Sequence, residues 1–471
     1  MSKNDVTFQR EEYKAALPAW NIVDDATSGD VDGYLPALNK TDTSPENKVR
    51  NDEYKEGAVY YNATRRTLQS LVGAAFRKVP TCTAPTGLEY IKDDIDGNGL
   101  SIYQQSQTTL SEALKKGRHA LLVDYPQTEG DSSRAEMNAG GIRATVAAYD
   151  ARSVRNWRTE RFGAVYRYTL VVLFEQASEP TDDGFGEEAV EQYRVLRLTD
   201  GVYTQEVWRK DSKSAWSLYQ EPWIVKNGAG KAWSEIPFTF VGSSNNDWHV
   251  DDSPIYDLAS LNIAHYRNSA DYEESVHIHG QATMVVNIGE MPADVFEKAN
   301  PNGLQVGARG GFVVGNGGSA DLLQMEANTA AKEAMDQKQE QMIAMGARLI
   351  TAGSAVKTAT EAQNENETEH SVLSLAVSNV SEAYTQCLEW MLEFMGGAGE
   401  VVYEINQEFT KPNLDAQTLA ALVQLWTTGK YPEADLWDQL RKYGLIDPEK
   451  EDETIKDELE RQGGGLALEV I

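Results

Sequence analysis

The spacing of apolar residues predicts several amphipathic helices. Residues 59–76 place their apolar side chains on one face at intervals of three and four, and Pro80 ends the pattern. The same spacing predicts a helix around residues 103–114, which Gly117 ends. The longest stripe predicts a helix over residues 360–395, with Leu373, Val377, Val380, Tyr384, Leu388, Met391 and Met395 on one face.

A different pattern runs from about residue 142 to residue 240. Short runs of β-branched and aromatic residues alternate there with Gly, Asp and Pro, which predicts an antiparallel β region. We expect the acidic stretch SEPTDDGFGEE, which starts at Ser178, to be a disordered loop. Upstream, the apolar run HALLVDYP at residues 119–126 predicts a buried strand, whereas residues 1–58 are polar and show little regular period.

The second half of the chain alternates helices with a short insert. Ser253 as N-cap and Pro254 at the first position predict a helix that runs to about residue 279. Short strands and glycines follow over residues 281–326, and then comes a polar helix rich in Gln and Met over residues 327–350. A break near Gly353 precedes the long helix, and a strand, further amphipathic helices and a tail complete the chain. This order predicts an α+β fold, and 471 residues exceed the usual size of one hydrophobic core.

Composition narrows the function classes. The two cysteines, Cys82 and Cys387, provide neither a disulfide framework nor a zinc cluster and are typical of a reducing cytoplasm. We expect no signal peptide and no membrane span, because the N-terminus is polar and no run of about 18 apolar residues occurs. With 43 basic and 73 acidic residues the net charge is −30, which disfavours tight DNA binding. Any contact with DNA must therefore be weak and sliding.

Two glycine-rich segments resemble ligand loops but have simpler interpretations. DIDGNG, which begins at Asp94, matches the opening of a calcium loop, but the twelfth position is Gln105 where bidentate calcium binding needs Glu. A turn rich in Asp, Asn and Gly is the favoured reading. VVGNGGSA at residues 313–320 loosely matches a dinucleotide-binding loop, but no βαβ unit follows, so a hairpin turn is favoured.

Three further patterns carry candidate chemistry. Ser354 and Lys357 form an S-x-x-K pattern, but the separate elements that a serine–lysine acylase requires are missing. His277 and His279 have a spacing that can chelate a metal, yet no cysteine is near, and two surface or interface histidines are the favoured reading. A basic stripe surrounds Trp157, and in so acidic a chain we expect it to pair with carboxylates at a subunit contact; it comprises Arg152, Arg155, Arg158 and Arg161. No catalytic or metal site is predicted.

Six stretches, in order along residues 50–400, together resemble tailed-bacteriophage portal proteins. They are EYKEGAVYYNATRRTLQSLVGAAFRKVP (53–80), DIDGNGLSIYQQ (94–105), KKGRHALLVDYP (115–126), AYDARSVRNWR (148–158), SPIYDLASLNIAHYRNSADYEESVHIHG (253–280) and the region 350–360. The resemblance implies an α/β wing at 1–252, stem helices at 253–280 and 327–349, and a small α/β clip between them at 281–326. It further implies a tunnel loop at 350–360, a long helix at 361–396, and C-terminal wing or crown helices with a tail at 397–471.

The resemblance also implies a function. Portal subunits form a ring, of twelve copies in virions, at one capsid vertex, and double-stranded DNA passes through it during packaging and ejection. The implied partners are the terminase large subunit at the clip, a head–tail adaptor that replaces it, and capsid and scaffold proteins at the wing. The implied locations are the portal vertex of the virion and, during assembly, the host cytoplasm. No enzymatic activity, cofactor or membrane is implied.

The implied channel residues are few. In the tunnel loop they are Thr351, Gly353, Ser354, Lys357 and Thr358. Lys332 and Lys338 on the second stem helix are further candidate cations, although all three lysines could instead pair with Glu333, Glu340 or Glu361. Three other functions stay open at this point: another ring component such as a head–tail adaptor, a serine or metal-dependent hydrolase, and an acidic DNA mimic.

Overall fold

The computed structural model describes residues 5–126, 142–181, 183–211, 213–280, 283–301, 303, 311–323, 329–350, 371–407, 409, 423–442, 446–447 and 450–461. The chain divides into two compact units, Met1–Asn406 and Gln407–Ile471. Within the described ranges, every helix is too short or too polar to cross a bilayer.

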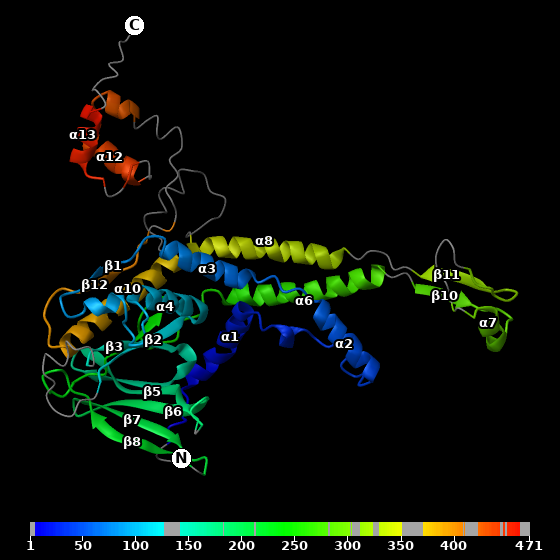
Figure 1. The fold of residues 1–471 in the computed structure, drawn as a ribbon, viewed down its shortest axis with the longest axis horizontal. Helices are drawn as coiled ribbons and strands as arrows, with labels where there is room; N and C mark the ends of the chain where they lie inside the picture. The colour runs from blue at the N-terminus through cyan, green and yellow to red at the C-terminus, as the bar shows by residue number, and fades with distance from the viewer. Residues whose placement is uncertain are drawn as a thin grey trace, which may run out of the picture. The chain divides into compact units, whose positions relative to one another are not determined.

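A three-stranded antiparallel sheet lies at the centre of the first unit, in the order β3 (Thr145–Asp150), β2 (Arg118–Asp124) and β9 (Phe238–Gly242). All residues of β2 but the last are buried, which confirms the predicted buried strand. Helices α4 (Ile102–Lys116) and α10 (Val372–Phe394) pack on this sheet and on each other (Figure 1). Gly117 ends α4 in a left-handed conformation, and a Cβ there would lie 2.4 Å from the Asp251 carbonyl oxygen.

Helix α10 contains the apolar stripe that the sequence predicts for the long helix. From Leu373 to Met391 the stripe is completely buried, and Gly396 adopts a left-handed conformation just after the helix. The buried hydroxyl of Tyr384 accepts a hydrogen bond from Thr109 (2.9 Å) and donates one to the Gln105 side chain (3.1 Å). These bonds fasten α10 to α4. Residues 360–370 of the predicted helix lie outside the described residues.

The predicted β region forms a second, five-stranded antiparallel sheet. Its order is β4 (Val154–Phe162), β5 (Val165–Pro180), β6 (Glu187–Thr199), β7 (Val202–Lys210) and β8 (Trp216–Ile224). The expectation of a disordered acidic loop from Ser178 is wrong for the described residues, because β5 and β6 stay paired as far as Pro180 and Glu187. Side chains supply the reason: Ser178 donates to Glu187 (2.6 Å), and Thr181 accepts from the Gly186 amide (2.9 Å).

Aromatic side chains fill the space between the two sheets. Trp157 of β4 and Tyr168 of β5 meet Phe240 of β9 edge-to-face, with ring centroids 5.5 and 5.9 Å apart. The buried guanidinium of Arg118 stacks on Trp157 and Phe240 and donates to the Trp248 carbonyl (3.1 Å). Burial lowers the pKa of Arg118 to about 9.

Three helices precede these sheets: α1 (Glu11–Ser28), α2 (Pro45–Gly57) and α3 (Ala63–Ala75). Short 3-10 turns occur at Asp32–Tyr34, Glu89–Lys92 and Ala151–Ser153. A small strand, β1 (Thr81–Thr83), pairs with β12 (Val402–Glu404) beside α10. The polar N-terminal region, which showed little period, is therefore largely helical.

An antiparallel helix pair, α6 (Tyr256–Gly280) and α8 (Ala330–Ile350), follows the sheets (Figure 1). Between the two helices the chain forms an insert of β10 (Thr283–Asn287), α7 (Ala293–Ala299) and β11 (Ser319–Leu323), in which the strands pair antiparallel. The predicted helix start is shifted: α6 begins at Tyr256, and the Ser253 hydroxyl donates to the Lys115 carbonyl.

The second unit contains α12 (Glu433–Lys442) and α13 (Asp452–Arg461). Leu436, Trp437 and Ile455 are its buried apolar residues within the described ranges. Arg441 joins the two helices by donating to the Lys450 carbonyl and pairing with Asp452.

Candidate functional site

The α6–α8 pair is the candidate functional element, because the predicted stem helices coincide with it. At about 1.5 Å per residue, α6 and α8 are roughly 37 and 31 Å long. All buried side chains described in α6 lie between Leu258 and Ala270, and none lies between Asp271 and Ile278. The first half of α6 is thus embedded in the unit, whereas its second half lies at the surface.

Asn262 anchors the embedded half. This side chain is fully buried, and its carbonyl oxygen accepts hydrogen bonds from the backbone and hydroxyl of Thr64, both at 3.0 Å. Its amide donates to the Tyr61 carbonyl (2.8 Å). One polar residue of α6 therefore fixes the start of α3, and nothing in the apolar spacing of the sequence marks it.

The N-terminal region supports the surface half of α6. Tyr54 of α2 donates to Asp271 (2.8 Å), and Arg50 pairs with Glu274 (3.3 Å). Arg267 donates to the Tyr34 carbonyl (3.0 Å). These contacts hold one side of α6 and leave Val276, His277 and Ile278 exposed.

Helix α8 lies almost wholly at the surface of the unit. Met342 is its single buried side chain among those described, and Ile343 is 66% exposed. Lys338 donates to Asn268 of α6 (2.6 Å), so this cation helps to join the helix pair. Lys332 is exposed near the start of α8.

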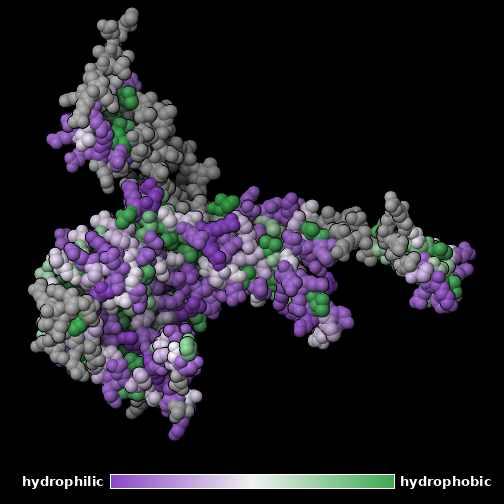
Figure 2. Space-filling view, in the orientation of Figure 1, coloured by the Kyte–Doolittle hydropathy of each residue, from purple (hydrophilic) through white to green (hydrophobic). Residues whose placement is uncertain are grey.

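The described residues of the insert form no core of their own. None of its described side chains from Met284 to Leu322 is buried, although many are apolar. Val285, Val295, Val313 and Leu322 are between 44% and 60% exposed. Figure 2 shows apolar patches at the surface of this segment. A two-stranded hairpin with one short helix is marginal in water by itself.

A family model matches one part of the chain. A family model described as a domain of unknown function (DUF4055) matches residues 254–395, which span α6, the insert, α8 and α10. No curated protein matches the chain.

Two solved structures share a low similarity with the chain. One is a chain from the "Virion of native gene transfer agent (GTA) particle", with a TM-score of 0.39 and 14% identity over 80% of this chain and 88% of that one. Another is from the "Neck of empty GTA particle computed with C6 symmetry", with a TM-score of 0.42 and 12% identity over 83% and 92% of the two chains. Similarities at this level do not decide function.

The predicted tunnel-loop residues Thr351, Gly353, Ser354, Lys357 and Thr358 lie outside the described residues. Their assignment to a channel, and that of Lys332 and Lys338, stay predictions. His277 is exposed on α6, and the described residues include no cluster of three or more His, Cys, Asp or Glu side chains that could hold a metal.

The Asp94 segment is a turn closed by its own backbone. Asp94 Oδ1 accepts from the amides of Gly97 and Gly99, both at 2.8 Å, and Asp96 Oδ1 accepts from Asn98 and Leu100. Asp94 also pairs with Arg143. The carboxylates are therefore used in shaping the loop, as the turn interpretation predicts.

The basic stripe around Trp157 has its partners inside the chain. Arg152 pairs with Asp24 (3.0 Å), and Arg158 pairs with Glu160 (3.2 Å). Arg155 stacks on the Phe174 ring at 4.8 Å, and Arg161 donates to the Gly163 carbonyl. Two of the four arginines therefore pair with carboxylates of their own chain. A subunit contact at this stripe stays a prediction.

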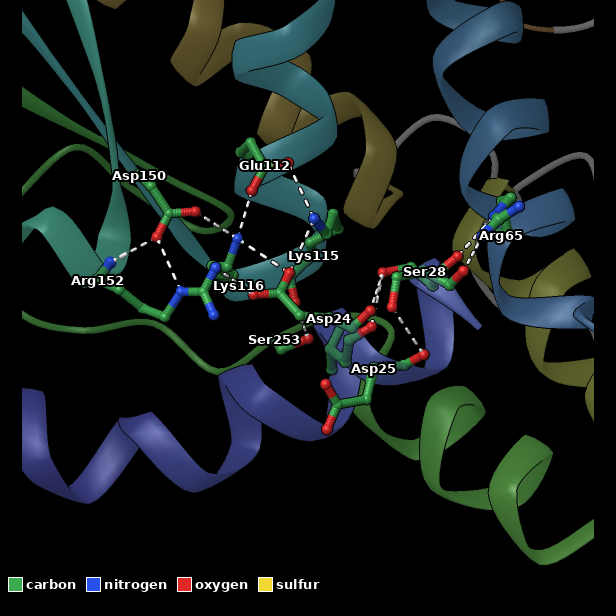
Figure 3. Close-up of polar contacts among 12 residues, drawn as sticks. Asp24, Asp25, Ser28, Arg65, Glu112, Lys115, Lys116, Asp150, Arg152 and Ser253 are labelled. Carbon is green, nitrogen blue, oxygen red and sulfur yellow. Dashed lines mark hydrogen bonds and ion pairs between the residues drawn. The ribbon is translucent and has the colours of Figure 1, made fainter. Parts of the chain in front are cut away.

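A buried ionic cluster joins α1, α4 and β3 (Figure 3). The Lys116 side chain is 1% exposed, and its Nζ lies 2.6 Å from Asp150 and 3.1 Å from Asp24, with Glu112 also paired. Burial by itself would lower the pKa of Lys116, but the three carboxylates raise it above its ordinary value. We call Asp24, Glu112, Lys115, Lys116, Asp150 and Arg152 the ionic cluster.

Proposed function

We propose that this chain is a subunit of a tailed-phage portal, a ring that forms the channel for double-stranded DNA at one capsid vertex. The observation that carries the proposal is the α6–insert–α8 segment, an antiparallel helix pair whose insert contains no buried side chain among those described. A free monomer leaves such a segment without a core, and a ring of copies supplies the missing partner surfaces. The order of elements, from the wing to the long helix, agrees with the resemblance of the sequence to portal proteins.

The charge of the chain suits a channel that must not hold its cargo. A net charge of −30 repels phosphates, and screening limits this repulsion to about 8–10 Å at physiological salt. On α8, Lys332 and Lys338 alternate with Glu333, Asp336 and Glu340, so the helix offers no continuous basic track. DNA can slide along such a wall without tight binding.

The proposal assigns partners to the parts of the chain. The insert is the docking surface for the terminase large subunit and later for a head–tail adaptor, because it is exposed and apolar. Scaffold and capsid proteins meet the two-sheet region. The chain itself hydrolyses no nucleotide and needs no cofactor, so the terminase supplies the energy for packaging.

Particle imaging of the purified chain, together with its native mass, tests the proposal. We expect rings with a central opening, built from about twelve copies of the 52.1 kDa chain. A compact dimer or tetramer without an opening would contradict it.

A further inference from the structure

A groove of about 800 Å³ opens on the first unit between α1, α3 and α4. Leu68, Val72 and Gly73 of α3 form an apolar side of this groove. Arg65, Lys115 and Arg152 line its polar side, together with Asp24 and Glu112 of the ionic cluster. The groove therefore offers an apolar surface with cations beside it.

Arg65 gives this groove its uncompensated positive charge. Its guanidinium donates to the carbonyl oxygens of Thr27 (2.6 Å) and Ser28, which carry no formal charge. Figure 3 shows Arg65 turned toward the end of α1, while Lys115 and Arg152 meet carboxylates on the other side. The lining thus holds three cations and two carboxylates in a chain whose net charge is −30.

The tip of the β5–β6 hairpin has the opposite character. Phe185 is 96% exposed, so it touches almost nothing in its own chain. The turn fixes it outward, since the Phe185 amide donates to Asp183 (3.1 Å) and the Thr181 amide donates to the Gly186 carbonyl (2.9 Å). Asp183, Glu187 and Glu188 add exposed carboxylates within three residues of Phe185. Hydrogen bonding from Thr181 lowers the pKa of Asp183, which keeps it ionised.

We propose that the β5–β6 tip of one copy docks into the α1–α3–α4 groove of a second copy. Phe185 would occupy the apolar side beside Leu68 and Val72, and Asp183 would face Arg65. The contact joins two different surfaces of the same chain, so it is heterologous and can propagate around a ring. It also gives the acidic hairpin tip a role. The inference rests on the self-association in the proposed function and adds the residues of one contact.

Engineered cysteines test the contact directly. We would combine Phe185→Cys with Gly73→Cys in a Cys82→Ser background, since a Cβ at Gly73 meets no atom within 4 Å and Phe185 is exposed. A disulfide requires Cα atoms within about 7 Å, so only a docked tip can form it. The matched control pairs Phe185→Cys with Gly57→Cys on α2, another open glycine outside the groove.

The full-length protein is oxidised with glutathione disulfide and separated on a denaturing, non-reducing gel. We expect the Gly73 pair to give a ladder of covalent oligomers, and the control pair to stay largely monomeric. If the Gly73 pair itself forms rings but gives no ladder, the docking contact is overturned while the portal proposal stays intact. Failure to form rings at all, seen by imaging of the wild type, would instead overturn the proposed function and with it the premise of this contact.

Charge reversal supplies a second readout that does not depend on cysteines. Arg65→Glu should lower the fraction of chains in rings at least tenfold at limiting concentration, and adding Asp183→Lys should restore most of it. Arg66→Glu is the matched control on the same helix, because Arg66 stacks on Tyr61 and does not line the groove. Equal effects of Arg65→Glu and Arg66→Glu, without rescue by Asp183→Lys, would contradict the pairing and indicate a different occupant of the groove.

Discussion

At the scale of single residues, Lys116 shows how a buried charge depends on its neighbours. Its ammonium group is enclosed by carboxylates from α1, α4 and β3, and the indole of Trp20 donates to its backbone carbonyl (2.7 Å). In such a cluster, removing one member takes a counter-charge from each of its partners.

We expect Lys116→Met to lower the free energy of unfolding by about 1–3 kcal/mol, because Asp24, Glu112 and Asp150 would lose their common partner and keep only Lys115 and Arg152. Denaturant unfolding followed by circular dichroism measures this change. Lys14→Ala is the control: Lys14 forms an exposed pair with Glu11, so its removal should cost no more than about 0.5 kcal/mol. Equal losses in the two variants would show that the cluster contributes little.

The pH dependence of the stability difference between wild type and Lys116→Met gives a second check. Lys116 lowers the pKa of Asp150 in the folded protein. The stabilisation from this pair is therefore complete above the pKa of Asp150 in the unfolded chain, near 4, and is lost as the pH falls through the lower pKa of the folded state. The pKa of Lys116 is raised in the folded protein. Its stabilisation is therefore complete below about pH 10, the pKa of an unfolded lysine, and is lost as the pH rises through the higher pKa of the folded state. The gap between wild type and Lys116→Met should therefore be widest between roughly pH 4 and 10.

At the scale of elements, the apolar pattern predicted the helices and strands whose buried residues follow a regular stripe or an unbroken run. The stripe of α10 and the apolar run of β2 are both buried as expected. Helix α1 was missed because Pro18 interrupts it and its buried residues are widely spaced. Within the predicted β region, strand β4 has no apolar run of its own because polar and charged residues occupy most of its positions, and its pairing with β5 defines it.

The candidate site was predictable only in outline. The helix–insert–helix order follows from sequence, but Asn262 and Lys116 do not, because a lone polar residue between apolar ones has no periodic signature. Most of their partners are distant in the chain, with Thr64 nearly 200 positions from Asn262. Such long-range bonding depends on the tertiary fold and is not encoded in any local window.

The hydrogen bonds of Tyr384 that join α10 to α4 give a prediction at this scale. Tyr384→Phe removes the hydroxyl between Thr109 and Gln105 and leaves both buried groups short of a partner. We expect a loss of about 1–3 kcal/mol in the free energy of unfolding, measured by denaturant titration. Tyr166→Phe, at an exposed position, should change it by less than about 0.5 kcal/mol. If Tyr384→Phe lowered the free energy of unfolding no more than Tyr166→Phe does, the hydrogen bonds of Tyr384 would not stabilise the contact between α4 and α10.

At the scale of the whole molecule, the first unit combines a well-packed region with an insert whose described residues form no core. The two sheets, α4 and α10 bury a continuous set of apolar residues, whereas the described insert side chains are all at least partly exposed. This contrast is the physical reason to propose assembly. The acidic charge of the chain then favours a role in which DNA passes by and is not held.

The most direct test is a density map of the assembled protein by electron cryo-microscopy. We predict a closed ring in which α6, α8 and the segment 350–360 line a central channel wide enough for duplex DNA, with the inserts of neighbouring copies in contact. A ring in which the α6–α8 pair points away from the axis, or an assembly with no channel, would contradict the portal account.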